Sequence, residues 1–207
     1  VLTTFADLDR HDQRGIYKGI LYQTNHLRLR SPERPAAKPV GTVRLAVLGD
    51  SFAMGQGVLA EDSYAWRLEH ELPRIKDGRY ETINTAISGL DAAHAVARYA
   101  ELGLPYNPDI AIYGFTINDL EGPHYVSSVT ARLDRYGLER SPLALWRLIG
   151  PGYVAVRERW FPPDGTFAHE LAHNYFDNPA AWSDFLAALD RLREINEQRG
   201  ICTVMFL

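Results

Sequence analysis

Short apolar runs that alternate with segments of helical periodicity constrain the fold of this 207-residue chain most strongly. Apolar runs of four to eight residues are typical of buried strands, and strands that alternate with helices predict an α/β domain with a mainly parallel sheet. We therefore expect a three-layer α/β/α sandwich with a flavodoxin-like sheet. The predicted strands cover residues 44–48, 80–87, 110–115 and 201–207, and Cys202 in the last of them is expected to be a small core residue.

The segments between these runs predict helices. Residues 61–72 place apolar side chains at intervals of four, and Pro73 is expected to end that helix. Residues 91–102 are rich in alanine. The pair Asn178-Pro179 is a typical helix start, an N-cap residue followed by proline, and a segment with one apolar face follows it up to Gly200.

The length fits one domain with a sizeable core. Three prolines between residues 32 and 39 predict that 1–40 is an extended N-terminal lead-in, so that the domain proper covers 41–207. Residues 120–177 are irregular and rich in aromatic side chains, which predicts an insert in this domain. The insert forms either a lid over the functional site or an accessory core packed away from it.

Charge and hydropathy exclude some partners. The net charge of -4 argues against a general nucleic-acid surface, which normally has a basic footprint. The densest basic patch, Arg28, Arg30 and Arg34, is diluted by Glu33 and is interpreted as a solvated face. No stretch is long and apolar enough to predict a membrane span. The chain as given is expected to be soluble, but it begins at Val1, which is compatible with a removed leader or anchor.

The first three predicted strands each end in small or polar residues. Ligands of parallel α/β sheets bind at the carboxyl ends of the strands, so these three ends are expected to meet at one site. The segments concerned are Gly49-Asp50-Ser51, Ser88-Gly89 and Thr116-Ile117-Asn118-Asp119.

The residues at these ends suit nucleophilic catalysis. A serine hydroxyl needs a base to take its proton and hydrogen-bond donors aimed at the oxyanion that forms. Ser51 supplies the hydroxyl, Gly89 allows a close backbone N–H, and Asn118 offers a side-chain NH₂. Each residue alone also suits a turn or a helix cap, whereas the three together favour catalysis.

These blocks resemble those of the SGNH (GDSL) hydrolase family. Gly49-Asp50-Ser51-Phe52 is similar to the first block of the family, residues 84–89 to its N-x-G-x-x-G block, and residues 116–119 to its G-x-N-D block. Ala86 and Thr116 replace two of the family glycines. The resemblance implies Ser51 as nucleophile, and the Ser51 and Gly89 N–H groups with the Asn118 side chain as the oxyanion hole. It also implies no metal and no organic cofactor.

The same resemblance implies a histidine base in a late D-x-x-H block, after a fifth strand. Because the sequence stops on the predicted fourth strand, we expect the domain to be incomplete at its C-terminus. No histidine of the chain is recognisable as that base, and His124, six residues after Asn118, lies nearest to a block. The expected function is a serine hydrolase, an esterase or deacylase, that forms an acyl-enzyme from a small ester or an acylated carbohydrate.

Two alternatives remain open. His169-Glu170-Leu171-Ala172-His173 matches H-E-x-x-H, in which two histidines on one helix face bind Zn²⁺ and the glutamate acts as general base of a metallopeptidase. The extended form of this motif, with a glycine and a third histidine, is absent. The other alternative is a binding module without catalysis on a hydrolase-like fold.

Overall fold

The computed structural model describes residues 14–17, 19–120 and 171–206, together with a few isolated positions between 145 and 160. The chain divides into two compact units, Val1–Gly122 with Ser183–Leu207, and Pro123–Trp182. Most of the predicted insert 120–177 lies outside the described residues, so its role as a lid stays a prediction. Among the helices that the structure describes, none has the length and apolar character needed to cross a membrane.

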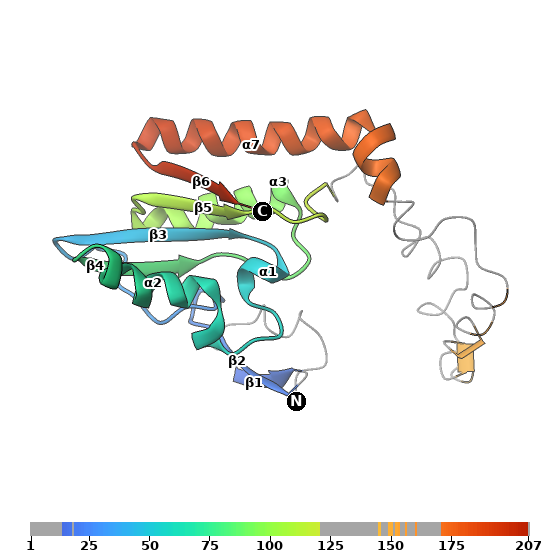
Figure 1. Cartoon of the computed structure of the whole chain (residues 1–207), viewed down its shortest axis with the longest axis horizontal. Coiled ribbons are helices and arrows are strands. Elements are labelled where there is room, and N and C mark those ends of the chain that lie inside the picture. Colours follow the sequence, from blue (N-terminus) through green and yellow to red (C-terminus); the bar gives the residue numbers. More distant parts are fainter. Residues whose placement is uncertain are drawn as a thin grey trace. The chain divides into compact units, whose positions relative to one another are not determined.

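The first unit contains a sheet of four parallel strands in the order β4, β3, β5, β6 (Figure 1). Strand β3 is the first of these four along the chain, and it is paired with the second, β4, and the third, β5, as in a flavodoxin-like sheet. Leu45 to Leu48 are buried, because strands inside a parallel sheet are covered on both faces. The strands are β3 (Thr42–Gly49), β4 (Arg79–Asn84), β5 (Ile110–Gly114) and β6 (Cys202–Phe206).

Helices cover both faces of this sheet, which gives the predicted three-layer sandwich. Helix α2 lies on one side and α7 on the other (Figure 1). The segment after α3 packs on α7, where the buried Tyr99 hydroxyl donates to Asn196 Oδ1 at 2.7 Å. The α-helices are α1 (Ser51–Met54), α2 (Tyr64–Ile75), α3 (Ala92–Arg98) and α7 (Pro179–Arg199), and the short helices are Ala60–Asp62, Tyr99–Gly103, Leu104–Tyr106 and His173–Asp177.

Two local predictions were wrong. Helix α2 does not end at Pro73 but continues to Ile75, because proline removes only one hydrogen bond when it lies in the last turn. That turn is closed by the Lys76 N–H, which donates to the Leu72 carbonyl at 2.9 Å. Cys202 is exposed and not a core residue, because β6 is the edge strand of the described sheet.

The N-terminal segment contains a hairpin that the sequence did not reveal. Strands β1 (Arg14–Tyr17) and β2 (Ile20–Gln23) pair in antiparallel fashion. Tyr22 and Leu29 are almost completely buried, at 1% exposure each. The part of residues 1–40 that the structure describes therefore contributes side chains to the core of the first unit.

The basic patch at residues 28–34 is not a solvated face, contrary to the interpretation of the sequence. Arg30 is only 9% exposed, and the side chain of Arg34 is 13% exposed. Arg34 pairs with Glu69 Oε1 at 2.5 Å, whereas Arg30 donates to backbone carbonyls that follow α1. These acceptors inside the fold bind the terminal nitrogens of both guanidinium groups and compensate part of their lost hydration, whereas neither buried Nε atom has a hydrogen-bond partner among the described residues.

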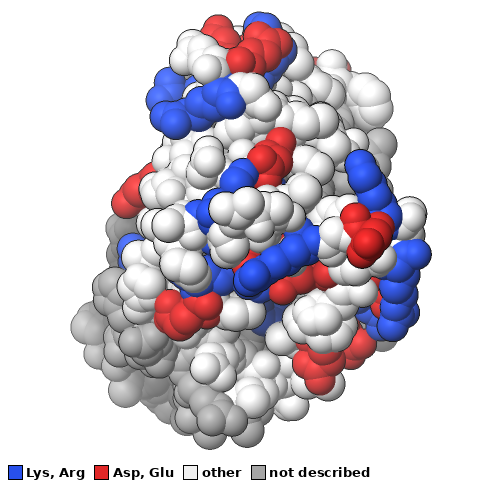
Figure 2. All heavy atoms as spheres, turned by 90° about the vertical axis from the view of Figure 1, so that its left-hand side faces the viewer, with Lys and Arg blue, Asp and Glu red and all other residues white. Residues whose placement is uncertain are grey.

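Charged side chains also gather at the amino-terminal edge of the sheet, where positive and negative groups are interspersed (Figure 2). Arg44 of β3 is fully buried, and its Nε donates to Glu81 Oε2 of β4 at 2.9 Å. Its terminal nitrogens donate to the carbonyl oxygens of Pro35, Ala36 and Tyr106, each at 2.8 Å. Arg44 thereby joins the N-terminal segment and the loop before β5 to the central strands.

Candidate active site

The three segments singled out in the sequence follow neighbouring strands of the sheet. In the parallel register, Gly49 of β3 is paired with Gly114 of β5, and Val47 of β3 with Asn84 of β4. Because the carboxyl ends of parallel strands lie at the same edge, the loops that carry Ser51, Gly89 and Asn118 all leave the sheet there. The three strand ends thus lie at one edge of the sheet, as expected, and their meeting at one site stays a prediction.

Ser51 is the first residue of α1, directly after a sharp turn out of β3. Gly49 has φ 139°, and a Cβ there would lie 2.8 Å from Ala53 Cβ and 2.9 Å from the Gly114 carbonyl oxygen, so only glycine fits. Buried Asp50 caps α1, since its Oδ1 accepts the Phe52 N–H at 2.9 Å. The half-buried Ser51 hydroxyl donates to Asp50 Oδ2 at 3.3 Å. The turn therefore presents the hydroxyl at the edge of the sheet.

The second block ties the end of β4 to the helix that carries Ser51. Asn84 is buried, its Nδ2 donates to the Ala53 carbonyl at 3.0 Å, and its Oδ1 accepts the Ala86 N–H at 3.1 Å. Gly89 has φ 83°, yet a Cβ there would have nothing within 4 Å. Glycine is therefore favoured at position 89 by its backbone conformation, and the close approach of its N–H to a ligand stays a prediction.

In the third block, Thr116 orients Asn118. The Thr116 hydroxyl donates to Asn118 Oδ1 at 2.8 Å, which fixes the oxygen end of the amide and directs the Nδ2 donor away from Thr116. Asp119 Oδ2 accepts the Thr116 N–H at 2.7 Å and closes the loop. Thr116 stands where the family pattern has glycine, so this departure from the pattern adds a hydrogen bond to the site residue.

Asp119 is a buried carboxylate directly beneath this loop, with 2% exposure. Burial raises the pKa of Asp119 to about 6, the bonds from the Thr116 N–H and the Tyr113 hydroxyl oppose the shift, and the charges of Asp50 and Asp91 add to it. The ionised form of Asp119 therefore destabilises the folded protein.

Replacing Asp119 with asparagine is expected to remove this penalty. The pKa of Asp119 in the folded protein lies above its ordinary value of 3.8, so the stability of the native protein relative to the variant is highest below that value and falls as the pH rises through about 6. A shift of this size corresponds to roughly 2–3 kcal/mol. The measurement is the urea-derived free energy of unfolding of both proteins at pH 4 and pH 7. A difference between the two proteins that does not change with pH would contradict the prediction.

One histidine of the described part is paired with a buried carboxylate. His94 Nδ1 lies 2.8 Å from both carboxylate oxygens of Asp91, which caps α3 and is 8% exposed in its side chain. The Ala92 N–H of the same turn donates to the Asp119 carbonyl at 3.2 Å, which joins α3 to the third block. Sequence analysis missed this pair, although Asp91 and His94 have D-x-x-H spacing. His124, which it considered, lies outside the described residues.

The structure describes the H-E-x-x-H motif only from Leu171 to its second histidine, His173. His173 begins the short helix His173–Asp177, and its Nδ1 lies 3.9 Å from Asp177 Oδ2. His169 and Glu170 lie outside the described residues. Within residues 19–120 and 171–206, no three His, Cys, Asp or Glu side chains come together as metal ligands.

Comparisons with known proteins gave a limited result. No protein-family model and no curated protein matches the chain. Among solved structures, the chain is similar to TesA, with 17% identity and a TM-score of 0.35 over 78% of this chain and 76% of that chain. It is also similar to AlinE4, an SGNH-hydrolase family esterase, with 20% identity and a TM-score of 0.36 over 81% of this chain and 77% of that chain.

Proposed function

We propose that the chain is a serine hydrolase that cleaves esters, with Ser51 as its nucleophile. The observation that carries the proposal is the arrangement at the carboxyl edge of the sheet. A turn that only glycine can make at position 49 presents the Ser51 hydroxyl, and the Thr116 hydroxyl orients the amide of Asn118. The proposed substrate is a small ester, with acylated carbohydrates included in that class.

In the proposed reaction, Ser51 Oγ attacks the ester carbonyl and its proton passes to a histidine base. The Oγ–carbon bond forms, the carbonyl oxygen becomes an oxyanion, and the alcohol leaves with the proton from the base. Water then attacks the acyl-enzyme by the same route and releases the acid. The Ser51 N–H lies at the start of α1, where helix N–H groups have no partner within the helix, and it donates to the oxyanion together with Gly89 and Asn118.

The base must be an imidazole rather than the nearby Asp50. The carboxylate of Asp50 accepts the Phe52 N–H, and a carboxylate is a weak base at neutral pH. Within the described residues, His94 is the imidazole that is paired with a buried carboxylate, so it is the first histidine to replace when the base is sought.

Replacing Asn118 with alanine is expected to lower kcat for an aryl ester by about 10²–10³-fold and to leave KM almost unchanged. The reason is that the amide donates to charge that develops only in the transition state. Thr116→Val, which removes the hydroxyl that holds Asn118 Oδ1, is expected to give a smaller loss of the same kind. The measurement is steady-state hydrolysis of p-nitrophenyl acetate. An increase in KM at constant kcat would instead place Asn118 in ground-state binding.

A further inference from the structure

Helix α1 has a single turn, so most of its carbonyl groups need partners outside regular helix bonds. The Ser51 carbonyl accepts the Gln56 N–H at 2.8 Å, and the Phe52 carbonyl accepts the Gly55 N–H at 3.0 Å. The Ala53 carbonyl is taken by Asn84, as described above. The Met54 carbonyl remains, and it is bound by Arg30 of the N-terminal segment, which also binds the carbonyl of the C-cap residue Gly55.

Arg30 makes a fork of hydrogen bonds to the chain that follows the nucleophile. Its Nη1 donates to the Met54 carbonyl at 3.1 Å and to the Gly55 carbonyl, and its Nη2 donates to the Val58 carbonyl at 2.8 Å. Gly55 has φ 81°, and a Cβ there would lie 3.0 Å from Arg30 Nη1 and 2.8 Å from Ser63 Cβ. The guanidinium is thus packed directly against the backbone at the end of α1.

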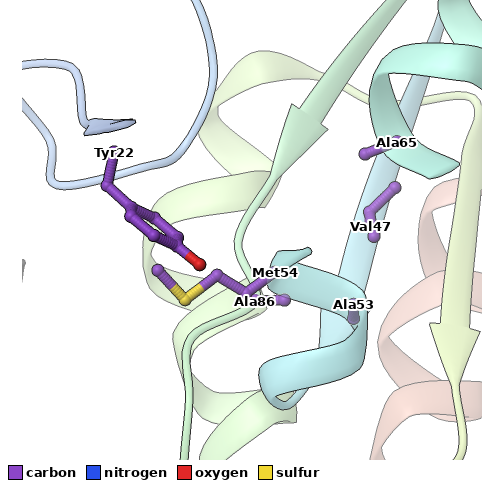
Figure 3. Close-up of a cluster of buried hydrophobic side chains, with 6 residues drawn as sticks. All are labelled: Tyr22, Val47, Ala53, Met54, Ala65 and Ala86. Carbon is purple, nitrogen blue, oxygen red and sulfur yellow. The ribbon is translucent and has the colours of Figure 1, made fainter. Parts of the chain in front are cut away.

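Tyr22, which comes from the same N-terminal segment as Arg30, also binds the chain that follows α1. The centre of the Arg30 guanidinium lies 4.2 Å from the centroid of the Tyr22 ring, and the Tyr22 hydroxyl accepts the Gly57 N–H at 2.6 Å. Figure 3 shows Tyr22 beside Met54 of α1, in a buried cluster that also contains Ala53. Residues 54–58 are therefore held by one cationic fork and one phenol.

We infer that Arg30 is a positioning residue for Ser51, an inference that rests on the proposed function. Only two residues separate Ser51 from Met54, and α1 has too few internal hydrogen bonds to keep its place alone. Arg30 fixes the far end of this turn, and Gly49 with Asp50 fixes the near end. Without the guanidinium, the carbonyls of Met54 and Val58 lose their donor, Gly55 keeps only the 3.4 Å bond from the Val58 N–H, and the nucleophile is free to shift relative to Gly89 and Asn118.

The test is the rate at which a fluorophosphonate labels Ser51 in Arg30→Ala, with Arg34→Ala as the matched control. Arg34 comes from the same segment but binds Glu69 and Glu81, on α2 and β4, and not the chain after Ser51. We expect Arg30→Ala to label about 10²-fold more slowly, the cost of a misplaced reacting group, and Arg34→Ala to label at the native rate. The labelling rates of both variants are measured at a temperature below the melting temperature of the less stable variant.

Added guanidinium chloride separates positioning from a general loss of stability. Arg30 lines a cavity of about 440 Å³, also lined by Ser63 and Trp66, through which a free guanidinium ion can reach the vacated place. Millimolar guanidinium is expected to restore part of the labelling rate of Arg30→Ala and to leave Arg34→Ala unchanged. If Arg30→Ala does not fold, Arg30→Lys, which keeps the charge but not the fork, is expected to label slowly as well.

Each failure has a distinct meaning. Native labelling rates in a folded Arg30 variant would overturn the inference and leave the proposed function intact. Equal losses of labelling rate in the Arg30 and Arg34 variants, without rescue by guanidinium, would also overturn the inference. A native protein that is folded but does not label would contradict the proposed function itself, and the inference would fall with it.

Discussion

Replacing Ser51 with alanine is expected to abolish ester hydrolysis, with a loss on the order of 10³-fold or more in kcat/KM. In the proposed reaction the hydroxyl forms the acyl-enzyme, and residues 49–54 contain no other hydroxyl or thiol. The fold should survive, because the hydroxyl donates only a 3.3 Å bond to Asp50, while the cap of α1 is made by Asp50 itself. Initial rates with p-nitrophenyl acetate measure the loss.

Ser88→Ala is the matched control for this prediction. Ser88 also follows a strand at the same edge of the sheet, but its hydroxyl donates to Gln56 Oε1 at 3.1 Å and has no part in the proposed reaction. This variant should retain most of the native rate. Similar losses in both variants, or no loss in Ser51→Ala, would show that the hydrolysis does not depend on Ser51 as a nucleophile.

The second large effect is expected on stability, from replacing Arg44 with methionine. This change leaves the Glu81 carboxylate, 4% exposed in its side chain, without its closest partner, and three backbone carbonyls without their donor. Breaking a buried pair in this way costs about 3–5 kcal/mol of the free energy of unfolding. Burial raises the pKa of Glu81, but the bond from Arg44 and the charges of Arg34 and Arg44 outweigh it and lower that pKa.

A double variant tests the cause of this loss. Arg44→Met combined with Glu81→Gln should recover part of the stability, because no buried carboxylate is then left without its main partner. Urea-induced unfolding of the native protein, both single variants and the double variant completes the cycle. A loss below about 1 kcal/mol for Arg44→Met would place this ion pair among solvated surface pairs, contrary to the structure.

Much of the architecture was predictable because its signals are local. Strands β3 and β5 are continuous apolar runs, which buried parallel strands require. The start of α7 was predicted from Asn178-Pro179, and Asn178 Oδ1 does accept the Ala181 N–H, at 3.3 Å. The convergence of three strand ends then follows from parallel topology alone. The roles proposed for Ser51, Gly89 and Asn118 stay predictions until they are measured.

What the sequence could not show is a set of contacts between distant residues. Arg30 binds Met54, 24 positions later in the chain, and a guanidinium that donates to backbone carbonyls requires no particular residue type as its partner. For the same reason the cluster of arginines at 28–34 resembled a solvated face. The hairpin β1–β2 was missed because each strand has only four residues, too few for a clear alternation of burial.

The most direct test of the central claim is covalent labelling of the folded full chain with a fluorophosphonate, followed by mass spectrometry to locate the labelled peptide. An activated serine displaces fluoride from the probe and keeps the phosphonyl group, whereas an ordinary serine does not react. The account predicts a label on Ser51 that disappears in Ser51→Ala. No label on the folded protein, or a label on another residue, would contradict it.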